Sequence, residues 1–475
     1  MLKKMGKVVY LLSLLTTIVF VAFILILNVM PSKYLILMGL VLIVVYGVLG
    51  IITFKAKNKI VLSFVIIFDV VLGLLFGYGT YMVEETNDFF FKFSKGTDEY
   101  SLYYVVVLKD SNYQKLADLQ EKRIGTYTFN DVNYEKALTN IENKVSLTTT
   151  EYTTLTTLAT DLLDKKVDSI LIRDFNKDLL DSEVAEFKNM VKIIHTEKVV
   201  VKKKREQVKP LQGDVLNILI SGIDTNGDIN KVSRSDVNIV MTVNPNTHEV
   251  LLTNIPRDMQ VQLAGTTGIK DKLTHAGIYG VDMSRKTVED FLSTEIPYYL
   301  RVNFDSLVKV VDAIGGIDIN NDIAFQGRTR YFSKGVIHLN GKQALEYSRE
   351  RMKMPHGDWT RGLHQEEVIR AIITKVTTST ELLTSYTEIL DSLSSFIQTN
   401  IPIEVLKKYV KEQLDTMSSW NVINYAVAGS GSGNVETYSM PGVKLYVTYP
   451  DTTSVDFASK VINGMLANKK YSEIK

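Results

Sequence analysis

Cysteine is absent from this chain of 475 residues, and that absence excludes two kinds of site. Without thiols the protein can form neither a disulfide framework nor a thiolate zinc centre. Only six histidines are present, none in an HExxH spacing, and no GxSxG motif marks a hydrolase nucleophile. The net charge of +1 gives no general attraction to nucleic acid. The composition therefore disfavours thiolate-metal, serine-nucleophile and DNA-binding classes.

Long apolar runs are concentrated in the first 83 residues, at 8–29, 34–54 and 60–83. Each is long enough to cross a bilayer as a helix, and no small-residue cleavage site follows the first. Lysines precede the first run and separate the second from the third, whereas the intervening loop carries only Lys33. The positive-inside rule therefore predicts a multi-pass cell-membrane protein with a cytoplasmic N-terminus and everything after residue 83 outside.

The third run contains Asp69, with Gly73 and Gly77 at GxxxG spacing. A carboxylate inside the membrane is a candidate functional group. We favour a structural role, in which Asp69 bonds a neighbouring span and the glycines allow close helix packing.

The remaining chain divides by composition into a linker, a small α/β domain, a basic linker and a larger α/β domain. The predicted boundaries are 1–83 for the three-helix transmembrane region, 84–97, 98–200, 201–212 and 213–475. The small domain has alternating strand and helix patterns without a phosphate loop or metal spacing, which favours an accessory or partner-binding role. The basic linker is either solvated or in contact with anionic lipid heads.

Several later segments complete the larger domain. Residues 377–401 and 403–414 have helical patterns, and 421–429 and 443–450 have strand patterns. GSGSGN at 429–434 lacks the lysine of a phosphate loop and predicts a flexible turn.

Charged residues stand at the ends of three predicted strands of the larger domain: Asp224, Arg234, Asp236 and Arg257. Ligands of α/β sheets bind beside strand ends, and two carboxylates there suit magnesium. Taken singly, either aspartate could instead form a turn or pair with Arg234.

The stretch EYSRERMKMPHGDWTRGLHQ at 346–365 places Arg349, Arg351 and Arg361 close together. In an extended segment Arg349 and Arg351 would point the same way, and on a helix Arg361 and Gln365 would share a face. Gly357-Asp358 is a plausible N-cap for that helix. Guanidinium forks beside a helix start suit phosphate or pyrophosphate. The alternative is a surface cluster paired with the acidic residues of the same stretch.

Taken in order, GIDT, SRSD, IPRD, DKLTHA, LNGKQALEYSRER and DWTRGLHQ resemble the motifs of the LytR–CpsA–Psr family of Gram-positive envelope proteins. The match covers about residues 214–376. Three spans followed by an accessory domain also resemble the arrangement of the family's streptococcal capsule members. The resemblance implies an α/β/α catalytic domain with a mixed central sheet.

The family transfers a glycan 1-phosphate from a polyprenyl-pyrophosphate carrier to peptidoglycan and releases polyprenyl phosphate. For this chain that implies a magnesium-dependent phosphotransferase of cell-wall and capsule biogenesis, which attaches capsular polysaccharide or a related anionic glycopolymer. The expected partners are the lipid-linked glycan, peptidoglycan, the membrane and other capsule-assembly proteins, and not nucleic acid. Apolar stretches such as ILISGI, VNIVMTV and VKVVDAIGG could line a slot for the isoprenoid tail, or serve as ordinary core.

The resemblance also implies roles for individual residues. Asp224 and Asp236 would hold Mg²⁺ against the pyrophosphate, and together with Arg257 and Arg361 they would be catalytic. The groups expected to hold the pyrophosphate oxygens are Arg234, Arg257, Arg349, Arg351, Arg361 and Gln365.

This sequence departs from the family pattern in two places. His364, Gln365 and Glu366 stand where the family often has RQQ, so a possible further cation is missing. DKLTHA continues as GIYG, which alters the expected rim near Lys272 and His275. Two rival functions stay open, namely a non-catalytic binder of lipid-linked glycan and a regulator of capsule synthesis. Direct DNA binding conflicts with the predicted topology.

Overall fold

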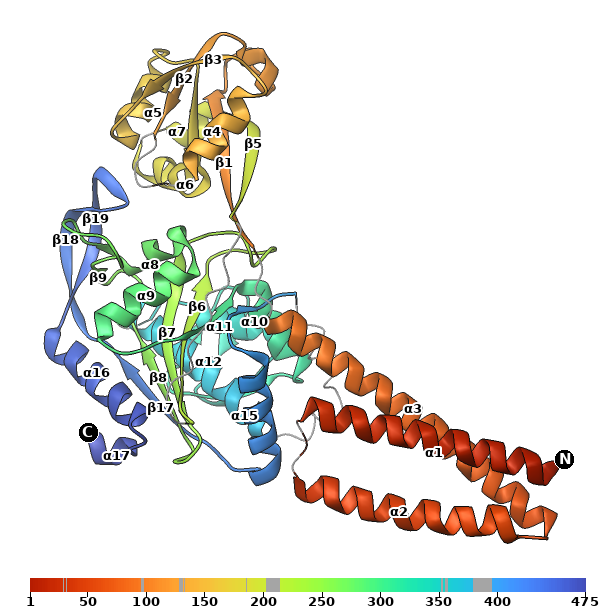
Figure 1. The fold of residues 1–475 in the computed structure, drawn as a ribbon. Coiled ribbons are helices and arrows are strands. Elements are labelled where there is room, and N and C mark those ends of the chain that lie inside the picture. The colour runs from red at the N-terminus through yellow and green to blue at the C-terminus, as the bar shows by residue number, and fades with distance from the viewer. Residues whose placement is uncertain are drawn as a thin grey trace. The chain divides into compact units, whose positions relative to one another are not determined.

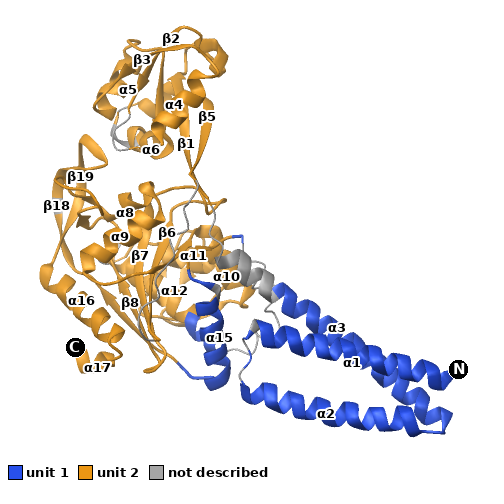
Figure 2. Cartoon of the chain, viewed as in Figure 1, with its two compact units in different colours: residues 1–95, 373–395, 401–419 blue, residues 96–372, 396–400, 420–475 orange. Residues whose placement is uncertain are grey.

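The computed structural model describes residues 1–28, 30, 32–94, 98–127, 131, 133–184, 186–201, 214–351, 353–354, 358–378 and 395–475. The chain forms two compact units (Figure 2). One comprises residues 1–95, 373–395 and 401–419, and the other comprises 96–372, 396–400 and 420–475. The basic linker at 202–213 and most of the predicted helix at 377–401 lie outside the described residues.

The first unit contains three helices long and apolar enough to cross a membrane, which confirms the three predicted spans. They are α1 (Leu2–Leu27), α2 (Ser32–Lys55) and α3 (Lys59–Ser94). Polar side chains join α1 to α2, because the hydroxyl of Tyr46 lies 2.8 Å from that of Ser13 and 2.6 Å from that of Thr17. The same unit includes α15 (Ile403–Thr416), where Asp415 pairs with Lys33 at 2.8 Å.

The predicted role of Asp69 is only partly right. Asp69 is fully buried, but neither carboxyl oxygen has a hydrogen-bond partner among the described residues, so the expected bond to a neighbouring span is missing. A Cβ on Gly73 would lie 3.6 Å from the Cα of Ser13, whereas one on Gly77 would meet no described atom within 4 Å. Close packing therefore holds at Gly73 and fails at Gly77.

The second unit begins with the accessory domain, a five-stranded sheet in the order β3-β2-β4-β1-β5 (Figure 1). Its strands are β1 (Glu99–Leu108), β2 (Lys122–Thr126), β3 (Leu147–Glu151), β4 (Ser169–Arg173) and β5 (Val191–Val201). Its helices are η1 (Leu116–Leu119), α4 (Tyr134–Glu142), α5 (Leu155–Leu163), α6 (Asp174–Glu183) and α7 (Phe187–Met190). The predicted alternation of strands and helices is confirmed, although the segment between β1 and β2 forms only the short 3-10 turn η1.

The larger module of this unit is built on a six-stranded mixed sheet in the order β16-β11-β6-β7-β8-β17. Its strands are β6 (Leu216–Ile223), β7 (Ser235–Asn244), β8 (Glu249–Asn254), β11 (Tyr298–Val302), β16 (Gln398–Thr399) and β17 (Asn421–Ala426). β6 is central, parallel to β11 and antiparallel to β7, and it is apolar and buried along almost its whole length, as a strand covered on both faces must be.

Helices cover both faces of this sheet, which gives the expected α/β/α arrangement (Figure 1). One face packs Leu219, Val240 and Leu251 against α9 (Val281–Leu292) and α16 (Thr452–Leu466). On the other side lie α10 (Phe304–Ala313), α11 (Gly341–Arg349) and α12 (Asp358–Thr378). The remaining elements are β9 (Gln260–Val261), β10 (Asp271–Lys272), α8 (Leu273–Ala276), η2 (Gly277–Tyr279), β12 (Ile317–Asn321), β13 (Phe325–Gln326), β14 (Tyr331–Phe332), β15 (Gly335–Leu339), β18 (Gly429–Thr437), β19 (Met440–Pro450) and α17 (Tyr471–Ile474).

The predicted flexible turn at 429–434 is wrong, because these residues begin β18 and pair with β19. Gly429 and Gly431 are needed there for close approach and not for flexibility, whereas a Cβ on Gly433 would meet no described atom within 4 Å. A Cβ on Gly429 would lie 2.5 Å from the carbonyl oxygen of Tyr449, and one on Gly431 would lie 2.3 Å from the Tyr446 hydroxyl. Glycine in a strand often marks such a contact.

Candidate functional site

The charged residues predicted at strand ends gather at one edge of the larger sheet. Ile223 at the end of β6 pairs with Ser235 at the start of β7, and Gly222 pairs with Val237. Asp224 therefore directly follows the paired part of β6, and Asp236 lies at the bulge of β7 between Ser235 and Val237. β8 runs antiparallel to β7 and ends at Asn254, three residues before Arg257. Since paired strands lie about 4.8 Å apart, the register brings these segments together.

Asp236 is the centre of this edge. Arg257 donates to its Oδ2 at 2.6 Å, and Thr274 donates to its Oδ1 at 2.8 Å. Burial pushes the pKa of Asp236 upward, but Arg257, the Thr274 hydroxyl, Arg234 and Arg361 outweigh it and hold the pKa below its ordinary range. The carboxylate is therefore charged at neutral pH, with three arginines close enough to act on it.

The short helix α8 brings Thr274 to this carboxylate because Gly277 lets the chain press against the start of β7. A Cβ on Gly277 would lie 2.5 Å from the nitrogen of Ser235 and 2.6 Å from the carbonyl oxygen of Ser233. The backbone of Thr274 also donates to the carbonyl of Arg257 at 2.9 Å. DKLTHAG therefore contacts two arginine-bearing segments, the one that carries Arg234 and the one that carries Arg257.

Arg349 comes from α11, on the face of the sheet opposite α9 and α16 (Figure 1). A Cβ on Gly341, at the start of α11, would lie 2.2 Å from the carbonyl oxygen of Val308 in α10, so these helices pack closely. Arg349, at the end of α11, lies over the Phe304 ring at 4.0 Å, and its Nη2 is 4.0 Å from Oδ1 of Asp224. The extended conformation considered for Arg349 and Arg351 does not hold at Arg349, because α11 continues to that residue.

Arg361 lies in the first turn of α12 and acts on Asp236 at this edge. Gly362 makes this possible, since a Cβ there would lie 2.0 Å from the side-chain nitrogen of Asn254 at the end of β8. Four residues further along α12, Gln365 lies 3.5 Å from the carbonyl of Ser348, next to Arg349. Arg351 is exposed, and no described contact brings it to Asp224 or Asp236. The predicted cap residue Gly357 lies outside the described residues.

His364 and Glu366 are interior residues. His364 is 6% exposed and stacks on Tyr347 at 4.2 Å between ring centroids, and burial lowers its pKa. Glu366 is 0% exposed, and burial, with the neighbouring Glu367, raises its pKa to about 9. Both side chains are therefore neutral at pH 7, and His364 supplies no further cation.

Two residues at this edge were missed in the sequence. Thr274 lies inside DKLTHA, whose fixed order pointed to a site without showing which member contacts Asp236. Phe304 follows β11, which runs parallel to β6 and ends beside it, with Val302 opposite Gly222. The signal for Phe304 was a strand end at the same edge, which only the sheet order reveals.

The edge carries more positive than negative charge. Arg234, Arg257 and Arg361 act on Asp236, and Arg349 lies beside Asp224, so four guanidinium groups face two carboxylates. The neighbouring Lys272 is neutralised by Asp258, with which it forms an ion pair. Such an excess suits a ligand with at least two negative charges, and planar guanidinium forks match phosphate oxygens.

The two carboxylates also fit a magnesium ion held partly by its ligand. Within the described ranges no group of three or more His, Cys, Asp or Glu residues could cage a metal. Mg²⁺ is commonly bound by one or two carboxylates and completed by substrate phosphates, and this edge carries the two carboxylates Asp224 and Asp236.

Fold and site together define a membrane-anchored α/β protein with an arginine-rich, carboxylate-bearing sheet edge. The chain belongs to the LytR_cpsA_psr family, which matches residues 184–452.

Two sequence relatives support this assignment. The polyisoprenyl-teichoic acid–peptidoglycan teichoic acid transferase TagU of Bacillus cereus is 40% identical over 197 residues, which are 41% of this chain and 64% of TagU. TagU of Bacillus anthracis is 34% identical over 254 residues, 53% of this chain and 80% of the relative. The chain thus spans less than two thirds of the B. cereus relative. The crystal structure of B. subtilis TagV is 31% identical and covers 54% of this chain and 98% of that chain, with a TM-score of 0.45.

Proposed function

We propose that this protein attaches an anionic glycopolymer, such as a capsular polysaccharide, to peptidoglycan by transferring a glycan 1-phosphate from a polyprenyl-pyrophosphate carrier. The observation that carries this proposal is the gathering of Arg234, Arg257 and Arg361 around the charged Asp236, with Arg349 beside Asp224. Family membership and the names of the TagU relatives, which specify a polyisoprenyl-linked teichoic acid and peptidoglycan, support the same reaction class.

The arrangement suits phosphoryl transfer because that reaction needs charge stabilisation and positioning more than a covalent nucleophile. The arginines would hold the two phosphates of the donor and stabilise the charge that develops as the bond to the polyprenyl phosphate breaks. The acceptor hydroxyl of peptidoglycan would form the new phosphodiester, and polyprenyl phosphate would leave. Arg257 is already fixed by Asp236, so little reorganisation is needed at that position.

Asp224 and Asp236 would hold Mg²⁺ in this proposal. The ion would neutralise part of the pyrophosphate charge. Asp236 would keep Arg257 and Thr274 in place, and Asp224 would orient Arg349.

One face of β7 offers a surface for the isoprenoid tail. Val237, Met241 and Val243 lie on it and are only partly buried, although Ile239 on the same face is fully buried. Val240 and Thr242 on the other face are also buried. Leu307 and Val308 on α10 are also partly buried. This is the region that the apolar stretches VNIVMTV and VKVVDAIGG occupy, and an apolar lipid slot here would lie beside the arginines.

The test is transfer of labelled glycan phosphate from a polyprenyl-pyrophosphate donor to peptidoglycan by the full chain in detergent or lipid. We expect transfer that stops with chelator and returns with Mg²⁺, and donor cleavage that falls at least 100-fold in Asp224→Ala. Donor binding without cleavage by the wild type would favour a non-catalytic carrier-binding protein instead. Cleavage that survives both chelator and Asp224→Ala would overturn the metal assignment.

The membrane orientation is part of this proposal. By the positive-inside rule, lysines at 3, 4 and 7 and at 55, 57 and 59 favour a cytoplasmic N-terminus and a larger module outside, where peptidoglycan lies. Protease added to cells stripped of their wall should digest residues after 98. Full protection would show the opposite orientation.

A further inference from the structure

The accessory domain and the larger module of the second unit share buried charged contacts. Glu99, the first residue of β1, accepts from Arg301 of β11 at 2.5 Å, and Arg301 is 1% exposed. Tyr100 exchanges backbone hydrogen bonds with the segment 230–232, at 3.0 Å to Asn230 and 2.8 Å from Val232. This segment ends two residues before Arg234. Truncating one partner of a buried ion pair is costly, so these contacts fix the domain rather than loosely tether it.

Arg173 makes the most direct of these contacts. It is the last residue of β4, its side chain is 4% exposed, and its Nη2 donates to the backbone carbonyl of Ile278 at 2.7 Å and to Ser101 at 2.8 Å. Asp131 lies 3.5 Å from its Nη1 and keeps the guanidinium oriented. An arginine of the accessory domain therefore holds the backbone of η2 in the larger module.

The segment that Arg173 holds is the one that reaches the active site. Ile278 directly follows Gly277, where any Cβ would clash with the backbone of residues 233–235. It lies four residues after Thr274, which donates to Asp236. Residues 274–278 are thus clamped between Arg173 on one side and the backbone that carries Arg234 on the other. A displacement of Ile278 would be transmitted to both Thr274 and Arg234, because no side chain separates Gly277 from that backbone.

Helix α6 of the accessory domain acts on the same backbone from another direction. Asp174, its first residue, pairs with Lys231 at 2.8 Å, three residues before Arg234. Burial raises the pKa of Asp178 one turn later, and the positive charges of Arg234 and Lys231 oppose that rise. Arg234 is therefore close enough to the accessory domain to feel its charge.

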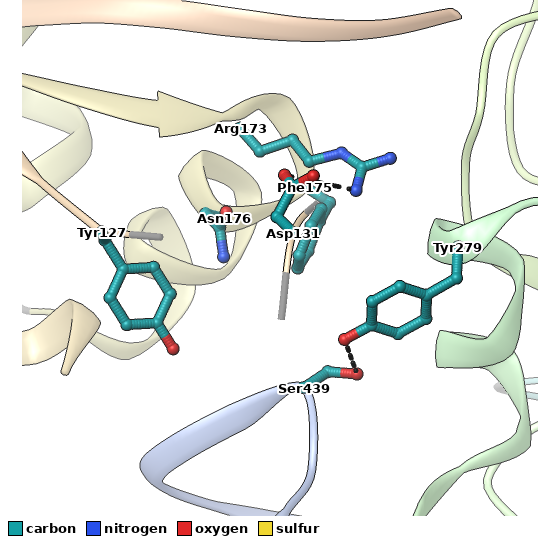
Figure 3. Close-up of a pocket in the computed structure, with 7 residues that line it drawn as sticks. All are labelled: Tyr127, Asp131, Arg173, Phe175, Asn176, Tyr279 and Ser439. Carbon is teal, nitrogen blue, oxygen red and sulfur yellow. Dashed lines mark hydrogen bonds and ion pairs between the residues drawn. The ribbon is translucent and has the colours of Figure 1, made fainter. Parts of the chain in front are cut away.

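The space between these contacts is not a ligand site. A cavity of about 10 Å³ is lined by Tyr127, Asp131, Arg173, Phe175, Asn176, Tyr279 and Ser439 (Figure 3). This is room for about one water molecule and too little for a sugar or a phosphate. At its far wall Tyr279 donates to Ser439, which donates to Asp271, the partner of His275. Polar side chains that line the cavity therefore lie between Arg173 and α8.

We propose that Arg173 is a positioning residue of the active site and that the accessory domain is a built-in support for the arginine cluster. It holds the backbone of Ile278, and through it sets where Thr274 and Arg234 stand relative to Asp236. Catalytic geometries tolerate displacements of only about 0.5 Å, so support of this kind affects turnover more than binding. The effect on turnover rests on the proposed phosphotransferase function, but the effect on residues 273–280 does not.

The first experiment measures backbone order and needs no substrate. Hydrogen–deuterium exchange of the full chain should be at least fivefold faster over residues 273–280 in Arg173→Ala, where the amides of Leu273, Thr274 and Gly280 are hydrogen-bonded. Exchange over α10 should be unchanged. The matched control is Arg123→Ala, which removes an accessory-domain arginine whose partners, Asp168 and the carbonyl of Lys165, both lie within that domain. Unchanged exchange over 273–280 in Arg173→Ala would overturn the proposal.

The second experiment measures turnover and donor affinity. We expect Arg173→Ala to lower turnover at least fivefold while donor affinity changes less than twofold, with Arg173→Lys intermediate and Arg123→Ala within twofold of wild type. Equal loss in all three variants would show a general structural effect and overturn the positioning role. Inactive wild type with accelerated exchange in Arg173→Ala would refute the proposed function and leave the support intact. If Arg173→Ala does not fold, Arg173→Lys carries both measurements, because a lysine cannot bridge Ser101 and Ile278 as the fork does.

Discussion

Asp236 and Asp224 stand at the ends of neighbouring strands, yet they are held in different ways. Asp236 has a 2.6 Å ion pair with Arg257, and the two side chains are 15% and 21% exposed. Asp224 lies 4.0 Å from Arg349, and the two side chains are 35% and 55% exposed. One pair is closed and partly buried, and the other is open to solvent.

The difference indicates that the two ion pairs have different roles in binding the donor. The closed pair is preorganised, because its geometry exists before any ligand arrives and changes little on binding. The open pair can exchange partners, since a solvent-exposed pair at 4.0 Å contributes little to stability. We infer that Asp236 and Arg257 form the fixed base of the site, and that Arg349 and Asp224 adjust to the donor.

The largest expected effect is a difference in the free energy of unfolding between variants of the two carboxylates. Asp236→Ala should abolish transfer and lower the free energy of unfolding by about 2 kcal/mol, because it leaves Arg257 partly buried without its partner. Asp224→Ala should abolish transfer too, but change stability by less than about 0.5 kcal/mol. Denaturant unfolding of both variants measures this. Equal destabilisation would show that the open and closed pairs are not distinct.

A smaller effect is expected for the arginines of the two pairs. Arg257→Lys and Arg349→Lys should each lower turnover by at least about tenfold, or about 1.4 kcal/mol of barrier, since lysine lacks the planar fork. Donor affinity should fall less than turnover, because the isoprenoid tail still binds. Steady-state transfer beside direct donor binding tests this, with the exposed Arg328→Lys as control. Loss of affinity with intact turnover would favour simple carrier binding.

A pH-dependent effect concerns a third carboxyl group, Glu366, whose pKa moves the opposite way from that of Asp236. The stability that Asp236 contributes is present above its unfolded pKa and is lost as pH falls. The folded pKa of Glu366 is about 9 and its unfolded pKa is about 4.3. Folded protein therefore keeps a proton that unfolded protein releases, and stability falls as pH rises between these values.

Glu366→Gln should remove that fall. We expect its thermal midpoint to exceed that of wild type by several degrees at pH 8 and to match it near pH 5. Glu436→Gln, which changes an exposed carboxyl, is the control and should leave the pH dependence unaltered. Parallel pH profiles for wild type and Glu366→Gln would mean that Glu366 is charged in the folded protein. A protonated Glu366 has nearly the shape of a glutamine, so Glu366→Gln changes its charge state without changing its size.

The sequence predicted the parts of this site that depend on strand ends. Asp224, Asp236 and Arg257 follow or precede strongly apolar strands, so their shared edge could be anticipated from the pattern alone. The approach of Arg361 through Gly362 could not, because nothing in the residue type shows that Asn254 lies 2.0 Å from where a Cβ would be. The same limit explains the error at Gly429 and Gly431, whose neighbours come from β19. Arg173 looked like an ordinary strand end because its partner is a backbone carbonyl far along the chain.

The boundary between the two units does not coincide with any single point in the sequence. The chain passes from one unit to the other at 95/96, 372/373, 395/396, 400/401 and 419/420. A recombinant protein that begins at residue 98 would therefore retain α15 while losing α3, with which α15 packs, and the loop residue Lys33 that pairs with Asp415. Removing the membrane helices therefore removes part of the compact unit to which α15 belongs. The remaining α15 would expose a face that is covered in the whole protein.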